Sequence, residues 1–85
     1  MKLSEKAEEI LETLWVTVEE EGRPGLDADG LGTRLDDPAI SELIGNSLVT
    51  VTGGMLNFTE AGHAEGRMTI RRHRLAERLM MDVLN

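Results

Sequence analysis

His73 and Glu77 are the residues whose types and spacing point most directly to chemistry. In a stretch expected to be helical, residues four apart lie on one face, so an imidazole and a carboxylate there can share a divalent cation. An ordinary polar pair on a helix surface has the same spacing. The spacing alone leaves both interpretations open, a pair of metal ligands and a solvated helix face.

The same stretch carries a stripe of arginines. The spacing i, i+4, i+7 and i+11 places four of them along one side of a helix: Arg67, Arg71, Arg74 and Arg78. Guanidinium groups in such a row can neutralise the phosphates of a nucleic acid. They can equally form a solvated face whose partners are the glutamates of the N-terminal half. The stripe is therefore a candidate DNA contact, with ion pairing inside the chain as its alternative.

Sequence motifs of catalysis are absent. The chain has no Cys, no nucleophile elbow G-x-S-x-G and no H-E-x-x-H, and its glycines fit neither the phosphate-loop nor the dinucleotide-binding spacing. Of the remaining candidates, His63 is expected to be a surface residue and Trp15 a core residue. We expect a protein that is not an enzyme and has no small-molecule substrate.

The composition fits one small domain that apolar burial must stabilise. Among 85 residues, 40% are hydrophobic, and without Cys neither disulfides nor thiolate zinc sites can contribute. No apolar run reaches the roughly 18 residues that a membrane span needs, so we expect a cytoplasmic protein with no membrane contact. The net charge of −7 is uneven, because residues 1–40 hold eleven acids against four bases, whereas all five arginines of residues 41–85 fall within 67–78.

Caps, periodicity and Gly/Pro positions predict five elements. In chain order they are a helix capped by Ser4 and running to about Glu21, a short helix from Asp27 to about Leu35, a helix Ala39–Ile44 after Asp37-Pro38, a hairpin of strands 48–51 and 55–58 joined at Gly53-Gly54, and a helix capped by Thr59 and running from Glu60 to about Leu84.

This order predicts a mostly α (α+β) fold, a winged helix-turn-helix with three N-terminal helices, a two-stranded β wing and a long C-terminal helix. Residues 1–58 would form the winged-helix domain, and residues 59–85 a linker and dimerisation helix continuous with it. The last helix has apolar flanks on two sides: Leu75, Leu79 and Val83 on one, and Ile70, Met80, Met81 and Leu84 on the other. This apolar surface is larger than one contact with the rest of the domain would cover. We therefore expect a homodimer formed through this helix.

Two segments carry a family resemblance. The stretch L-N-F-T-E-A-G-H-A-E-G-R-M-T-I-R-R-H-R-L-A-E-R-L of residues 56–79, continuing to Asn85, contains R-H-R-L-A-E-R-L and the turn T-E-A-G. The stretch E-E-I-L-E of residues 8–12, followed by E-E-E-G at 19–22, is a second, weaker match. Together they resemble the diphtheria-toxin-repressor-like, metal-dependent transcriptional regulators, and the N-terminal stretch resembles the manganese-sensing branch.

The resemblance implies a metal site. His73 and Glu77 match metal-coordinating positions, and Glu9 and Glu12 match positions where manganese sensors supply two carboxylates. Oxygen ligands with one imidazole and no thiolate suit Mn(II) or Fe(II). The alternative for Glu9 and Glu12 is a solvated acidic face, since neighbouring residues are also acidic. We expect metal binding to be weak or absent in this chain.

The recognition helix departs from the family pattern. Residues 36–47 are about half a dozen residues short and contain no Lys or Arg. Ser41 would face the DNA major groove, while Asp36, Asp37 and Glu42 would present the wrong sign of charge to phosphates. The family continues beyond the position of Asn85 into helices that complete the metal site and the dimer interface, so we expect either a fragment or a reduced relative.

The resemblance thus implies the N-terminal winged-helix part of an iron- or manganese-dependent bacterial transcriptional regulator. DNA contacts would come from Ser41 and from Arg67, Arg71 and Arg74, and binding would be weak. The alternative is an acidic dimerisation or protein-interaction module that kept the scaffold and lost DNA reading.

Overall fold

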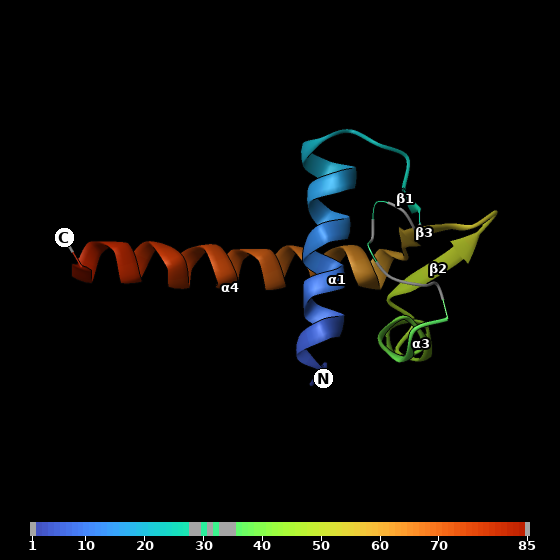
Figure 1. The fold of residues 1–85 in the computed structure, drawn as a ribbon, viewed down its shortest axis with the longest axis horizontal. Helices are drawn as coiled ribbons and strands as arrows, with labels where there is room; N and C mark the ends of the chain where they lie inside the picture. Colours follow the sequence, from blue (N-terminus) through green and yellow to red (C-terminus); the bar gives the residue numbers. More distant parts are fainter. Residues whose placement is uncertain (1, 28–29, 31, 33–35, 85) are drawn as a thin grey trace.

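The computed structural model describes residues 2–27, 30, 32 and 36–84, with side chains as far as Leu75. Helices and a small sheet alternate along the chain (Figure 1). In order they are α1 (Glu5–Trp15), its π-helical continuation η1 (Val16–Glu20), β1 (Leu26–Asp27), α3 (Pro38–Gly45), β2 (Val49–Thr52), β3 (Met55–Phe58) and α4 (Glu60–Leu84). The described part is therefore a mixed fold of helices and one antiparallel sheet.

The first helix begins and ends as its sequence predicts. The Ser4 hydroxyl accepts a hydrogen bond from the Ala7 amide, which is the expected N-cap contact. Beyond Trp15 the helix widens to π-helical geometry, and Gly22, at φ +70°, ends it with a bond from the Arg23 amide to the Thr17 carbonyl. No residue pattern along this helix indicated the π-helical turn.

The hairpin is confirmed, but the sheet has three strands, so the expectation of two strands was wrong. The β2–β3 turn uses Gly53 and Gly54, both at positive φ, as a two-residue hairpin requires. The additional strand β1 pairs antiparallel with β3, with Leu26 opposite Leu56. Gly25 precedes it, and an added Cβ there would lie 3.0 Å from the Leu56 carbonyl oxygen. A two-residue strand is too short to leave a periodic pattern.

Helix α3 matches the prediction closely. Asp37 caps it by accepting a hydrogen bond from the Ala39 amide at 2.9 Å, and Pro38 occupies the first turn. The helix that was expected from Asp27 to about Leu35 lies largely outside the described residues. What is described there is the Asp27 carboxylate accepting a hydrogen bond from the Gly30 amide.

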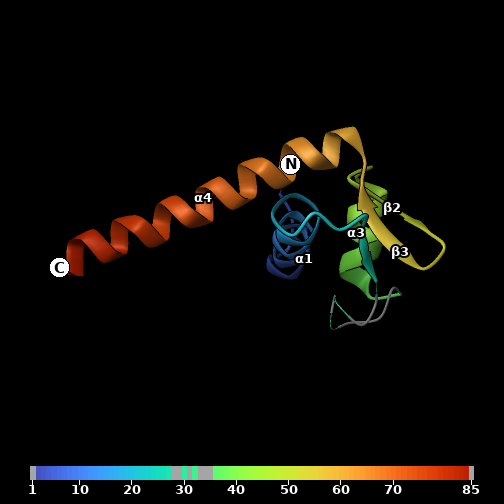
Figure 2. The ribbon, with the colours of Figure 1, turned by 90° about the horizontal axis from the view of Figure 1, so that it is seen from above.

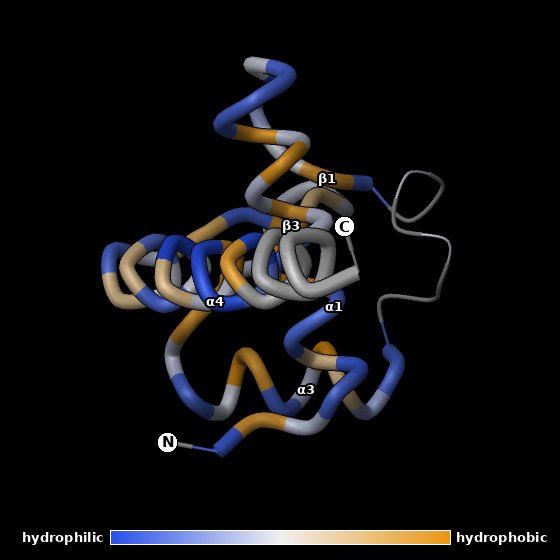
Figure 3. The backbone as a smooth tube through the Cα atoms, turned by 90° about the vertical axis from the view of Figure 1, so that its left-hand side faces the viewer, coloured by the Kyte–Doolittle hydropathy of each residue, from blue (hydrophilic) through white to orange (hydrophobic). Residues whose placement is uncertain are grey.

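The core lies between α1, α3 and the sheet. Its fully or nearly buried side chains are Ala7, Ile10, Leu11, Leu14, Leu26, Ala39, Ile40, Leu43, Leu48, Val49 and Leu56. Along α1 and α3, hydrophobic positions recur at helical spacing between hydrophilic ones, so each helix has one apolar side (Figure 3). Aliphatic burial therefore holds the elements that position the polar residues.

Helix α4 is attached to the other elements through its N-terminal half. Thr59 caps it through the Gly62 amide and also donates to the Ser47 carbonyl, which ties the helix to the end of α3. The N-terminal half packs across α1, and the C-terminal half projects beyond every other element (Figure 2). No helix in the described part of the chain is long and apolar enough to span a bilayer.

Candidate functional site

Four side-chain pairs bridge α4 to α1 and η1 where the helices cross. Each joins an acid of the first helix to a base of the last: Glu8–Arg72 at 3.4 Å, Glu12–His73 at 2.7 Å, Glu19–His63 at 2.7 Å and Glu20–Arg74. Leu11 and Leu14 are buried in the core. Glu8 and Glu12, which are one helical turn apart, lie on the side of α1 that meets α4. The crossing is therefore a mixed acid–base seam.

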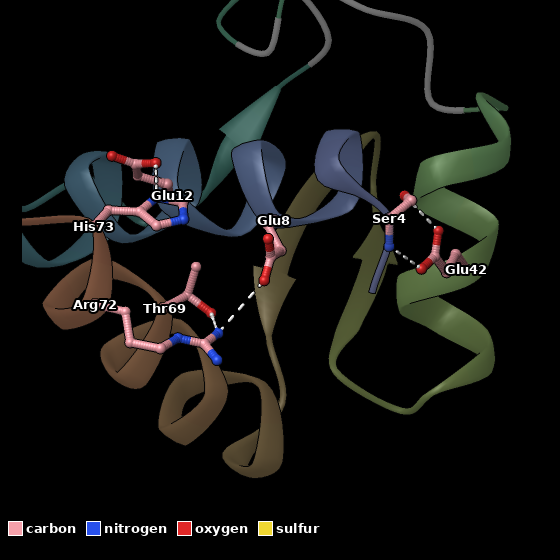
Figure 4. A network of polar contacts seen from close by, with 7 residues as sticks. All are labelled: Ser4, Glu8, Glu12, Glu42, Thr69, Arg72 and His73. Carbon is pink, nitrogen blue, oxygen red and sulfur yellow. Dashed lines mark hydrogen bonds and ion pairs between the residues drawn. The ribbon is translucent and has the colours of Figure 1, made fainter. Parts of the chain in front are cut away.

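Glu12 and His73 are the candidate ligands that the structure brings together. The Glu12 Oε2 atom lies 2.7 Å from His73 Nδ1, although the residues are 61 positions apart (Figure 4). The side chains are 34% and 36% exposed, so the pair is reachable from solvent. A carboxylate oxygen and an imidazole nitrogen are thus preassembled at the crossing.

Glu9 and Glu77 stand apart from this pair in different ways. Glu9 is exposed, one turn before Glu12, and both carboxylates line an open groove of about 590 Å³ along α1. The side chain of Glu77 lies outside the described ones. Among the side chains that are described, no three acids, histidines or cysteines converge as they would around a bound metal ion.

The structure divides the arginine stripe. Arg74 pairs with Glu20, as the alternative interpretation expects, and the off-stripe Arg72 reaches Glu8 and the Thr69 hydroxyl at 3.4 Å each. Arg67 and Arg71 are exposed and make no ion pair with any described side chain. The Arg78 side chain lies beyond the described ones. Two guanidinium groups of the stripe are thus available to a polyanion.

Two acids of this region, Asp37 and Glu42, have partners inside the chain. The Glu42 carboxylate accepts two hydrogen bonds from Ser4, at 2.8 Å from its amide and 2.7 Å from its hydroxyl (Figure 4). These bonds hold the pKa of Glu42 below its usual range, the side-chain bond being the larger cause. Asp37 caps α3 and pairs with Lys6 at 2.6 Å. Ser41 lies on the exposed side of α3, together with the 46% exposed Ile44.

Sequence reasoning missed the surroundings of His63. Its ring lies 4.9 Å from Trp15 and edge-on to Phe58 at 5.7 Å, and its Nε2 atom contacts Glu19. No local signal joins Glu19 to His63 or Glu20 to Arg74, because the partners are 44 and 54 residues apart. The glutamates of the N-terminal half were the only sequence feature that indicated ion pairs between the first and the last helix.

Comparison of the chain with family models, with curated proteins and with solved structures found no match.

Proposed function

We propose that this chain is the N-terminal, winged-helix part of an iron- or manganese-dependent transcriptional regulator acting in the cytoplasm. The observation that carries the proposal is the contact between Glu12 and His73 at the crossing of α1 and α4. Residues this far apart in sequence meet at the positions where the resemblance places metal ligands. Folding thus supplies the proximity that spacing alone did not predict.

The donor set of the proposed site suits Mn(II) or Fe(II). Glu9, Glu12, His73 and Glu77 are the proposed ligands, and together they offer carboxylate oxygens and one imidazole with no thiolate. A bound cation would supply a positive charge that holds two helices together. Because no third described donor joins Glu12 and His73, binding in this chain is expected to be weak.

The proposed DNA-binding surface combines α3, the β2–β3 hairpin and the start of α4. In the winged-helix arrangement α3 presents Ser41 to the major groove and the hairpin is the wing. Support comes from Asp37, whose charge is offset by its ion pair with Lys6, whereas Glu42 accepts hydrogen bonds from the uncharged Ser4 and keeps its negative charge. Arg67 and Arg71 supply phosphate contacts that carry no sequence information.

The proposed assembly is a homodimer formed through α4. Its C-terminal half projects beyond the other elements, and its sequence there is rich in Leu and Met. Of the two apolar flanks expected from sequence, Ile70 is buried in the body, whereas Leu75 is 60% exposed. The dimer contact is therefore proposed for Leu79 and Val83, which continue this flank beyond Leu75 into the projecting half of α4.

Fluorescence anisotropy with a labelled DNA duplex at physiological salt tests the proposal. We expect weak binding that tightens when Mn(II) is added, and no tightening in the variant Glu12→Gln. The variant Glu19→Gln, which removes the neighbouring carboxylate that contacts His63, should respond to Mn(II) like the parent. If Mn(II) changes nothing, the metal-dependent function is wrong. If this chain binds a specific DNA site with nanomolar affinity in the absence of metal, α3 reads DNA bases better than its short sequence without Lys or Arg predicts.

A further inference from the structure

Helix α4 exposes an apolar strip on the side away from α1. Met68 and Leu75 are 59% and 60% exposed, the highest values among the large apolar side chains that are described. They are seven residues apart, so they lie two turns apart on one side of the helix. Thr69 and Ile70, by contrast, are buried. This strip is not part of the domain core.

The strip lies in an open groove with a basic rim. The groove has a volume of about 510 Å³ and is lined by Met68, Arg71, Arg72, Arg74 and Leu75. Arg72 and Arg74 also contact Glu8 and Glu20, but Arg71 has no ion pair with a described side chain, and neither has Arg67 one turn earlier. An apolar floor is thus combined with positive charge that no described carboxylate pairs with.

We propose that this groove binds an acidic amphipathic helix of a partner protein. Apolar residues at i, i+3 or i+4, and i+7 of that helix pack between Met68 and Leu75, and its carboxylates pair with Arg67 and Arg71. Met is well suited to this role because its flexible thioether adapts to the shape of an inserted side chain. The inference goes beyond the proposed function, because it assigns a protein partner to Met68 and Leu75 and involves none of the proposed metal ligands, although it shares Arg67 and Arg71 with the proposed phosphate contacts.

Charge selects this occupant over a second copy of the same face. Two α4 helices that pair through the strip about a two-fold axis would bring the arginine rims of the two copies together. Like charges across an interface oppose association. An acidic helix instead neutralises Arg67 and Arg71 while it covers Met68 and Leu75.

The test uses the whole chain and a fluorescein-labelled synthetic peptide of about 18 residues, long enough for several helical turns. The peptide carries Leu at i, i+4, i+7 and i+11 between Glu residues. One control peptide has the same composition with the Leu positions scrambled, and a second has Lys in place of Glu. Anisotropy gives each Kd, and circular dichroism confirms that each protein variant is folded.

We expect saturable micromolar binding of the acidic peptide and a loss of about tenfold or more in Leu75→Asn and Arg71→Glu. The Lys peptide should bind Arg71→Glu better than it binds the parent. Val51→Ser, a substitution at an exposed apolar residue of β2, should leave the Kd unchanged. Because Leu75 and Arg71 are exposed, these substitutions leave the core intact.

Four results would overturn the proposal. One is the absence of saturable binding up to millimolar peptide, and another is equal binding of the scrambled peptide. The third is self-association in sedimentation that Leu75→Asn abolishes, because the occupant would then be a second copy. A DNA duplex that competes with the peptide through Leu75 would also contradict a protein partner. None of these outcomes bears on Mn(II) binding at Glu12 and His73.

Discussion

Gly62 lies where the first turn of α4 passes over the end of α3 and the start of the hairpin. A Cβ atom added there would lie 1.5 Å from the Leu48 carbonyl oxygen, which itself accepts a hydrogen bond from the Thr59 amide. Backbone cannot move away as the end of a side chain can. The glycine of the T-E-A-G turn is therefore required by a close approach of two backbone segments.

Replacement of Gly62 by Ala should destabilise the protein by about 1–3 kcal/mol or more, because the methyl group forces the backbone apart. Gly45→Ala is the matched control, since an added Cβ meets nothing within 4 Å there. Urea denaturation followed by Trp15 fluorescence measures both. Equal stability of Gly62→Ala and the parent would mean that α4 does not pack on Leu48 in this way.

Glu42 predicts an acid-dependent loss of stability. Its pKa is lowered in the folded state by hydrogen bonds from the Ser4 hydroxyl and amide, so its stabilising effect is present above the ordinary Glu pKa. The effect is lost as the pH falls through the lowered value, because the protonated carboxyl no longer accepts both bonds as an anion. Melting temperatures should therefore differ between the parent and Glu42→Gln near neutral pH and converge in acid. A difference that does not depend on pH would contradict this role.

At the scale of elements, the parts predicted correctly are those that local chemistry defines. Ser4, Asp37 and Thr59 each cap the helix that follows within three residues, and Gly53-Gly54 fixes the two-residue turn of the hairpin. Such signals lie within a few positions of the structure they determine. Three helix starts and the hairpin therefore needed no knowledge of the packing.

The parts not predicted depend on contacts between distant segments. Strand β1 exists because Leu26 meets Leu56, and the π-helical turn at Val16–Glu20 has no known local signature in this sequence. For the site, spacing and resemblance named Glu12 and His73 but could not show that they meet. The pairing of Arg74 with Glu20 likewise needed the crossing of α1 and α4.

The divided arginine stripe predicts how DNA affinity responds to salt. Each phosphate contact contributes about −0.9 to the slope of log K against log salt concentration. Arg67→Ala and Arg71→Ala should each make the slope less steep by about that amount, whereas Arg74→Ala should change it less because Glu20 already neutralises this side chain. Anisotropy over a salt series measures the slopes. Equal effects of the three substitutions would mean that the Glu20 pair opens on DNA.

At the scale of the molecule, α1 connects the two proposed sites. Its N-terminus is tied to α3 through Ser4–Glu42 and Lys6–Asp37, and its middle meets α4 through Glu12 and His73. Helix α4 runs along the longest dimension of 46 Å, and α1 crosses it (Figure 1). A cation at the crossing would favour one position of α1, and with it one position of α3, which is a shift between populated states.

Calorimetric titration with Mn(II) tests this account most directly, and the chain offers a matched pair of variants. His73 and His63 both lie on α4, and each contacts a glutamate of the first helix at 2.7 Å, but only His73 meets a proposed ligand. The account predicts weak binding that is lost in His73→Ala and retained in His63→Ala, with both variants folded by circular dichroism. If His73→Ala titrates like the parent, the Glu12–His73 pair is structural and the chain does not sense metal at this crossing.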